Sequence, residues 1–129
     1  MRRISARRAA LIERASPYRE ALRDTCVCEA CGQPTIDGEV HEVCCGTGLR
    51  ELQLDKPFSS LLLCPGCHRP LLHDLPKAHG VAIGLALIQR SRPGDSNREH
   101  FFRLMARRWP DEALIDRWER ILNVRARTF

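Results

Sequence analysis

Two cysteine pairs with the same spacing frame the middle of this 129-residue chain, Cys28 with Cys31 and Cys64 with Cys67. A Cys-x-x-Cys turn can direct two thiolates at one tetrahedral ion, and two such turns complete a four-cysteine shell of the structural zinc kind. Two disulfides, or four unconnected buried thiols, are the alternative interpretation. Because disulfides are rare in reducing compartments, the spacing favours Zn²⁺. In a core this small the ion would supply much of the folding free energy, on the order of 10–16 kcal/mol.

Histidines gather around these cysteine pairs. Four of the five histidines lie between residues 41 and 79, and His41, His68 and His73 fall before, at and after the second pair. A strand histidine, one directly after the pair and one a turn later could converge on a second ion. Imidazole ligands with open coordination positions suit a divalent ion that binds phosphate. Alternatively, His68 is a fifth candidate for the zinc shell, or all three are surface histidines beside a structural ion.

The elements that must position these residues are short. Asp37-Gly38 is a hairpin signal that precedes a predicted strand from residue 39 to residue 44. Residues 46–60 have low predictability, and a buried apolar segment at 60–63 leads into the second cysteine pair. We expect a helix to begin around that pair, to carry His68 and His73 on its first turns, and to hold Pro70 near its start.

Helical patterns flank this region on both sides. Residues 2–24 carry apolar side chains on one stripe, but Ser16-Pro17 is typical of a helix start and predicts a second helix there. The first fifteen residues would then be a separate basic helix, or an arm that orders on a partner. Beyond residue 76 we expect three helices. The first runs to about residue 90, the second runs from a capping box at 96–99 to about residue 108, and the third follows Pro110. The last has an apolar face, which packs on the core or residues 81–88, or else on a partner chain.

The net charge of +5 is unevenly distributed. Residues 1–24 carry +4, residues 25–89 carry −3 and residues 90–129 carry +4, and 19 of the 21 basic residues are arginine. The planar guanidinium suits phosphate, so the arginine-rich flanks favour nucleic-acid contact over merely solvated helix faces. The longest apolar run, residues 81–88, is too short to span a membrane, and no apolar segment follows the N-terminal arginines. We therefore expect a cytoplasmic protein without a signal peptide.

The order of these motifs resembles that of a known enzyme family. Cys-x-x-Cys, Val-His-Glu-Val, a glycine-containing loop and Leu-Leu-Leu-Cys-x-x-Cys-His with a following histidine are similar to HNH endonucleases of the ββα-metal fold. The likeness covers roughly residues 26–75 and is strongest to small phage and mobile-element members with a four-cysteine zinc site. It implies a zinc-nucleated, treble-clef-like ββα-metal core at 25–75. Together with the helical patterns on both sides, we expect an α+β, predominantly helical protein with a basic helical segment at 1–24 and a C-terminal helical extension at 76–129.

The resemblance also implies roles for individual residues. Cys28, Cys31, Cys64 and Cys67 would hold the structural zinc ion. His68 would bind the catalytic Mg²⁺ or another divalent ion, and the residue pattern described above adds His73 as a further candidate ligand. In the family, the residue before the central histidine binds metal, and that histidine is the general base that activates water for attack on a phosphodiester.

The chain departs from the family pattern at two of these positions. In the register we favour, His41 is the metal ligand and Glu42 occupies the place of the base, although the reference pKa of glutamate, near ~4.3, makes it a weaker proton acceptor than imidazole unless burial raises it. In the other register His41 is the base and Val40 stands where a ligand belongs. Ser59 replaces the asparagine that orients the base loop in the family, and its hydroxyl could do part of that work.

Two hypotheses of different classes follow. The first is a metal-dependent DNA endonuclease or nickase that contacts the phosphate backbone, with phage or mobile-element proteins as further partners. Six arginines are candidates for phosphate contact, two beside the proposed centre and four in the N-terminal segment: Arg50, Arg69, Arg2, Arg3, Arg7 and Arg8. The second is a non-catalytic zinc module that binds DNA or a protein, which the departures at Glu42 and Ser59 favour. A purely structural protein that works through its C-terminal apolar helix is a weaker third reading.

Overall fold

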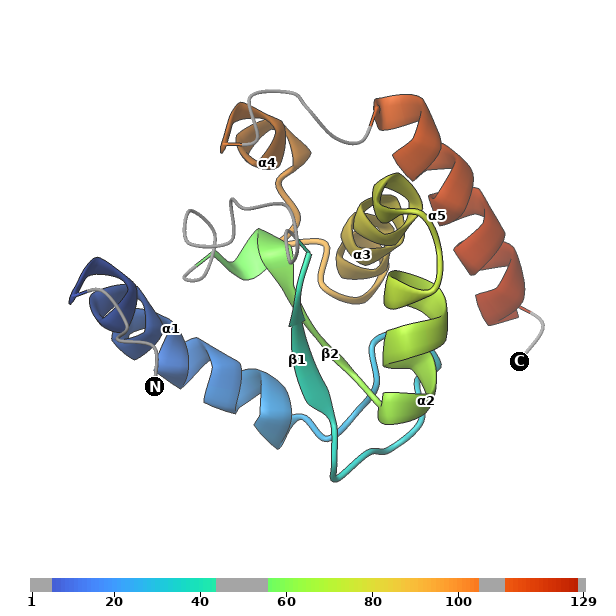
Figure 1. The fold of residues 1–129 in the computed structure, drawn as a ribbon. Coiled ribbons are helices and arrows are strands. Elements are labelled where there is room, and N and C mark those ends of the chain that lie inside the picture. The colour runs from blue at the N-terminus through green and yellow to red at the C-terminus, as the bar shows by residue number, and fades with distance from the viewer. Residues whose placement is uncertain (1–5, 44–55, 105–110, 128–129) are drawn as a thin grey trace.

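The computed structural model describes residues 6–43, 56–104 and 111–127 of the chain (Figure 1). In chain order the elements are α1 (Ala6–Asp24), β1 (Glu39–Glu42), the 3-10 turn η2 (Pro57–Ser59), β2 (Ser60–Leu63), α2 (Pro65–His68), the π turn η3 (Arg69–His73), α3 (Lys77–Ser91), α4 (Arg98–Leu104) and α5 (Glu112–Arg127). The regular elements among the described residues are helices and one small sheet, so the expected mixture of α and β structure with helices predominating is confirmed.

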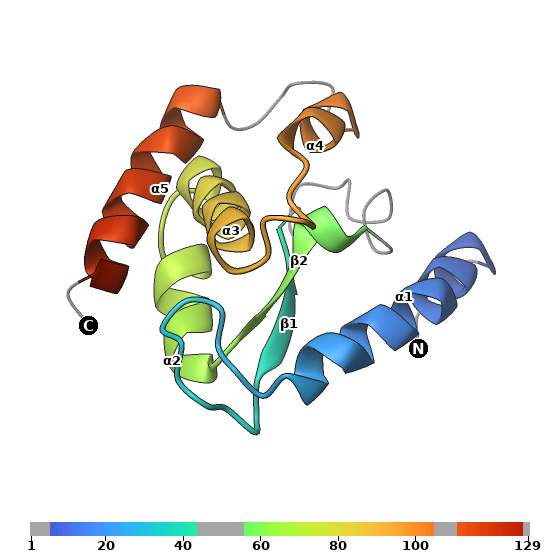
Figure 2. The same ribbon diagram turned by 180° about the vertical axis from the view of Figure 1, so that it is seen from behind.

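The two strands form an antiparallel pair in which Glu39 faces Leu63 and Glu42 faces Ser60. Helix α1 lies on one side of this pair, and α2 and α3 lie on the other (Figures 1 and 2). Successive side chains of a strand point to opposite faces. Val40 and Leu62 accordingly pack with Leu22 of α1 in a small cluster, whereas Leu61 and Leu63 of β2 belong to the main core.

The main core is built around α3. All residues of this helix from Gly80 to Ile88 are buried, which explains why its sequence is apolar on every side. Strand β2 covers one side of α3, and α5 covers another through Ile115 and Leu122 (Figure 1). The prediction that the apolar face of the last helix packs on residues 81–88 is therefore confirmed.

Two helix starts differ from the sequence predictions. Helix α1 continues through Pro17, so the second helix expected at Ser16-Pro17 does not form. Proline removes one backbone hydrogen bond, and the turns on both sides continue the helix across that gap. At α4 the capping side chain is Asn97 and not Ser96, because the Asn97 Oδ1 accepts a hydrogen bond of 3.0 Å from the backbone N–H of His100. Helix α5 begins after Pro110 as predicted, and the Asp111 carboxylate accepts a hydrogen bond of 2.8 Å from the N–H of Leu114.

Candidate metal centres

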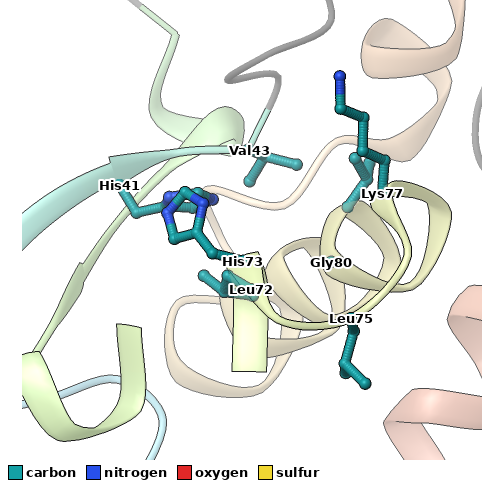
Figure 3. Close-up of a pocket in the computed structure, with 8 residues that line it drawn as sticks. His41, Val43, Leu72, His73, Leu75, Lys77 and Gly80 are labelled. Atoms are coloured by element: carbon teal, nitrogen blue, oxygen red, sulfur yellow. The ribbon is translucent and has the colours of Figure 1, made fainter. Parts of the chain in front are cut away.

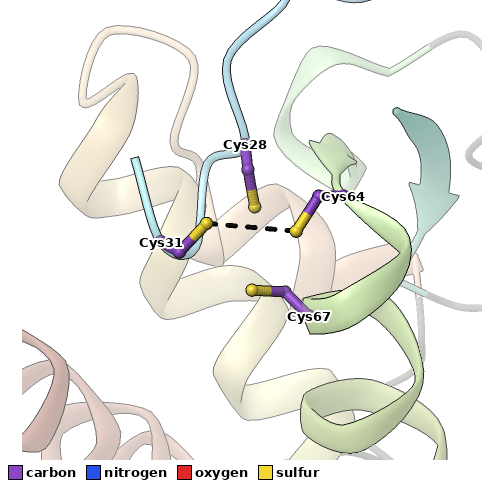
Figure 4. A group of neighbouring side chains, drawn as sticks. All are labelled: Cys28, Cys31, Cys64 and Cys67. Atoms are coloured by element: carbon purple, nitrogen blue, oxygen red, sulfur yellow. Dashed lines mark hydrogen bonds between the residues drawn. The ribbon is translucent and has the colours of Figure 1, made fainter. Parts of the chain in front are cut away.

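The four cysteines of the two pairs converge. Their sulfur atoms all lie within 4.8 Å of one another, and Cys31 Sγ lies 3.9 Å from Cys64 Sγ (Figure 4). All four are free thiols. The first pair sits on a loop closed by bonds between Cys28 and residues 32 and 33, with Gly32 at a positive φ of 74°. The second pair brackets the start of α2, where the N–H groups of Cys67 and His68 donate to the Cys64 carbonyl.

This spacing fits a tetrahedral ion. Sulfur atoms bound at about 2.3 Å to one zinc ion lie about 3.8 Å apart in a regular tetrahedron, and the measured Cys31–Cys64 separation is 3.9 Å. Cys28 is fully buried, whereas Cys31 is exposed. The cluster could therefore hold one ion such as zinc at the edge of the main core.

The electrostatics of the thiols point the same way. Burial opposes ionisation of Cys28, but hydrogen bonds from the backbone of Cys31 and Cys64 outweigh it and lower the Cys28 pKa to about 7. For Cys67, burial, the Cys64 thiol and the charge of Cys28 raise the pKa. Without a bound cation, ionisation of the Cys28 thiol is thus favoured and ionisation of the Cys67 thiol is opposed. A bound cation would reverse that resistance, because a coordinating thiol is deprotonated.

Three imidazoles converge on a second point. His41 from β1, His68 from the end of α2 and His73 from the end of η3 each offer a nitrogen, and these nitrogens lie within 4.8 Å of one another. His68 Nε2 lies 3.1 Å from His41 Nδ1 and 3.0 Å from His73 Nε2. The cluster is graded in exposure: His41 is buried, His68 is intermediate and His73 is exposed. One side of the three rings therefore opens toward the surface.

The nitrogen spacing fits a divalent ion with open positions. Two nitrogens at about 2.1 Å from an ion lie about 3.0 Å apart when they subtend a right angle and about 3.4 Å apart in a tetrahedron. The observed 3.0 and 3.1 Å match the right angle. Three imidazole ligands leave further coordination positions of such an ion available for water or a phosphate oxygen.

Glu39 supports this cluster from the same face of β1. Its Oε2 lies 3.2 Å from His68 Nδ1. An Nδ1–H that donates to this carboxylate leaves the lone pair on Nε2, the nitrogen that faces His41 and His73. The sequence analysis missed Glu39, although its position two residues before His41 in a predicted strand placed both side chains on one face.

A pocket of about 160 Å³ adjoins the histidine cluster (Figure 3). His41 and His73 form its polar wall, and Lys77 stands at its edge. Apolar side chains and one glycine supply the remainder of the lining: Val43, Leu72, Leu75, Gly80 and Val81.

Two glycines of α3 allow the close packing that positions the cluster. A Cβ at Gly80 would lie 2.6 Å from the carbonyl oxygen of Leu72, directly before His73. A Cβ at Gly84 would lie 2.9 Å from a methyl group of Val43, two residues after His41. Any larger residue at these positions would push α3 away from the two segments that carry His41 and His73.

The other predicted catalytic residues lie elsewhere. The Glu42 carboxylate forms an ion pair with Arg19 of α1, so the side chain proposed as the base faces α1 and not the histidine cluster. Ser59 is fully buried, and its hydroxyl donates to the Lys56 carbonyl at 3.1 Å. The Ser59 carbonyl accepts a hydrogen bond of 2.8 Å from the N–H of Val43. Ser59 thus fixes the chain just after β1 through its backbone.

Of the predicted phosphate contacts, only Arg69 can be placed by its side chain. It is 83% exposed and lies 3.4 Å from the Asp74 carboxylate. Arg2, Arg3 and Arg50 lie outside the described residues, and Arg7 and Arg8 lie in α1 without described side chains.

Arginines that the sequence analysis missed hold the first cysteine loop. Arg92 Nε donates to Glu29 Oε1 at 2.6 Å, and Arg90 Nη2 donates to the carbonyl oxygens of Glu29 and Ala30. Glu29 in turn exchanges two hydrogen bonds with Leu62 of β2, of 2.9 and 2.6 Å. No sequence signal identified these contacts, because they join residues that lie 33 to 63 positions apart.

Within the described ranges, no helix is both long and apolar enough to cross a bilayer. Comparisons with protein-family models, with curated proteins and with solved structures found no match for the chain.

Proposed function

We propose that this protein is a metal-dependent DNA endonuclease or nickase of the HNH type, built on a zinc-nucleated, treble-clef-like ββα-metal core. The observation that carries the proposal is the convergence of His41, His68 and His73 beside a four-cysteine cluster. The order of strand histidine, second cysteine pair and helix histidine is the order of the family motif. The order of two short strands followed by α2 supports a ββα arrangement.

The two clusters have different tasks in this proposal. Cys28, Cys31, Cys64 and Cys67 would hold a structural Zn²⁺, and the three histidines would hold Mg²⁺ or another divalent ion. A divalent ion at the histidines would acidify bound water and stabilise negative charge on a phosphodiester and its leaving oxygen. The chain itself orients His68 through Glu39, keeps His41 buried and leaves His73 on the open side.

The proposed proton acceptor, Glu42, is engaged by another residue. Glu42 stands at the motif position of the base, but its carboxylate is paired with Arg19. It can accept a proton from water at the histidine cluster only after leaving that arginine. Substitution by glutamine therefore tests the role directly: a base loses at least about 100-fold in kcat, whereas a structural partner of Arg19 leaves kcat unchanged in the folded protein.

DNA is the proposed substrate because the flanks of the metal centres are basic. Residues 1–24 and 90–129 each carry a net charge of +4, and phosphate neutralisation by such residues is the main source of sequence-independent affinity. A cytoplasmic location and phage or mobile-element partner proteins accompany the proposal on the strength of the motif resemblance.

A second function is favoured by the position of Glu42. A chain whose base position is engaged by Arg19, and whose motif asparagine is Ser59, could keep both metal centres and lose cleavage. It would then be a zinc module that binds DNA or a protein partner.

A nicking assay distinguishes the two functions. Supercoiled plasmid is incubated with the protein and Mg²⁺, Mn²⁺, Ni²⁺ or Zn²⁺, alongside the variants His41→Ala and His68→Ala. His100→Ala is the matched control, because this histidine contacts Phe58 and belongs to neither cluster. Metal-dependent nicking that both cluster variants lose and the control keeps supports the nuclease. DNA binding without nicking under any metal supports the module.

A further inference from the structure

The pocket beside the histidines has the size of one ring. Its volume of about 160 Å³ is close to the engineered cavity of about 150 Å³ that accommodates benzene. Most of its lining is apolar, from Val43, Leu72, Leu75 and Val81. Such a wall offers dispersion contacts to a ring and few hydrogen-bond partners for extra hydroxyl groups.

Lys77 lies at the far side of this pocket from the imidazoles. It is the first residue of α3, and in Figure 3 its side chain extends past Val43 with Nζ directed away from His41 and His73. Its ammonium is thus directed away from the imidazoles, although Lys77 lines the same pocket as they do. Only two of the 21 basic residues in the chain are lysines, Lys56 and Lys77. Lysine presents a compact charge on a flexible stem, which suits a point contact with a phosphate group.

The imidazoles, the ring-sized pocket and the Lys77 side chain follow one another in the same order as a scissile phosphate, its sugar and the neighbouring phosphate along a DNA strand. We propose that Lys77 is a positioning residue that binds the phosphate next to the scissile phosphate, while the pocket receives the deoxyribose between the two. This inference rests on the proposed nuclease function and adds a residue to its substrate contacts. Lys77 would hold the strand across the histidine cluster with the same contact before and during the reaction.

Two substrates of different length test this assignment. Plasmid DNA carries a neighbouring phosphate, whereas bis(4-nitrophenyl) phosphate has a single phosphodiester and no neighbour. Lys77→Ala should lower kcat/KM on DNA by about ten-fold or more, mainly through KM, because it removes a contact made before and during the reaction. Lys77→Arg should recover part of this loss. Hydrolysis of bis(4-nitrophenyl) phosphate should be the same in all three proteins.

Binding supplies a readout that does not depend on turnover. Fluorescence anisotropy with a short duplex is measured over a range of salt concentrations, without a catalytic divalent ion. Loss of one phosphate contact should reduce the slope of log affinity against log salt by about 0.9 in Lys77→Ala. Lys56→Ala is the matched control, because Lys56 does not line the pocket, and its slope should equal that of the unmodified protein.

Each remaining outcome overturns the assignment. An equal loss on both substrates would place Lys77 at the scissile phosphate or in the fold, and unchanged DNA cleavage with an unchanged salt slope would remove it from the interface. If the unmodified protein cleaves neither substrate, the proposed function fails. That result differs from failure of the Lys77 assignment, in which the unmodified protein cleaves DNA.

Discussion

The His68 imidazole is contacted on both nitrogens, and this double contact orients the ring. Nε2 faces the other two histidines, and Nδ1 faces Glu39 at 3.2 Å. The Glu39 side chain is 54% exposed, so its Coulomb energy with His68 is small. The Glu39 carboxylate acts mainly by orientation, because a carboxylate that accepts a hydrogen bond from a ligating imidazole selects its tautomer and holds the ring.

Glu39→Gln should therefore weaken divalent-ion binding at the histidine cluster by about 10–100-fold. The amide keeps the size of the side chain and removes the charge that favours Nδ1–H donation. Isothermal titration of Mn²⁺ into zinc-loaded protein measures the effect. Glu99→Gln, on the exposed surface of α4, is the matched control. Equal affinities in the two variants would contradict the orienting role.

Cys28 predicts how zinc affinity changes with pH. Its pKa in the folded protein, about 7, is lower than its ordinary value of 9.0. The thiolate is thus the main form above about pH 7 and is lost as pH falls through that value. Protons compete with zinc for Cys28 only below this point, so zinc affinity should fall more steeply with decreasing pH below 7 than above it. Competition with a chromophoric chelator from pH 6 to 8 measures the slope, and one constant slope would contradict the prediction.

At the scale of elements, helix α3 sets the distance between the histidines. Its two glycines contact the segments that carry His73 and His41. A Cβ at Gly80 would lie 2.6 Å from the Leu72 carbonyl oxygen, and a Cβ at Gly84 would lie 2.9 Å from a Val43 methyl group. Because Leu72 meets Gly80 through its backbone carbonyl, no rotamer change can relieve that contact. The same helix also forms the floor of the pocket and carries Lys77 at its start.

Gly80→Ala should consequently destabilise the fold and weaken the histidine site together. Helix propensity favours alanine by about 1 kcal/mol, whereas overpacking costs about 1–3 kcal/mol, so we expect a net loss of up to about 2 kcal/mol. Urea denaturation and Mn²⁺ titration measure the two effects. Gly94→Ala is the matched control, because a Cβ there meets no atom within 4 Å. A Gly80→Ala protein with unchanged ion affinity would show that α3 does not position His73.

At the scale of the whole molecule, the first cysteine loop joins parts that are far apart in sequence. Arg92 contacts Glu29 of this loop, the Tyr18 hydroxyl of α1 and the Ser60 carbonyl of β2. Burial raises the pKa of Tyr18 to about 12, which keeps its hydroxyl protonated and able to donate to the Pro57 carbonyl. A loop that contributes Cys28 as its one fully buried apolar residue has little core of its own. Besides the hydrogen bonds from Arg90, Arg92 and Leu62, the loop is therefore held to the rest of the protein mainly by the cysteine cluster.

Removal of zinc should unfold this assembly. Chelation is expected to lower the far-UV helical signal and the thermal midpoint, because structural zinc is worth on the order of 10–16 kcal/mol in small domains. Circular dichroism before and after a strong zinc chelator measures the loss, and Cys28→Ser should reproduce it without the chelator. Cys26→Ser is the matched control, because Cys26 is exposed and lies outside the cluster. An unchanged spectrum in zinc-free protein would refute a structural role for the ion.

The sequence by itself determined which cysteines and histidines could meet. Spacing within a Cys-x-x-Cys turn is a local property, and the order of strand, cysteine pair and helix brought His41 and His68 near that turn whatever surrounded them. The hairpin signal predicted a strand at 39–44, of which the structure shows residues 39–42, and the apolar run at 60–63 was predicted as a buried segment that the structure shows to be β2. The continuation of α1 through Pro17 was not predicted. One lost hydrogen bond does not by itself end a helix.

Only the tertiary structure decided the directions of the side chains around these ligands. The burial of Val40 against α1 sets the phase of β1, which directs Glu42 to Arg19 and Glu39 to His68. The pocket and the grip of Arg90 and Arg92 on the first loop depend on residues that are distant in the chain. Such contacts arise from packing between elements, and no local sequence pattern specifies them.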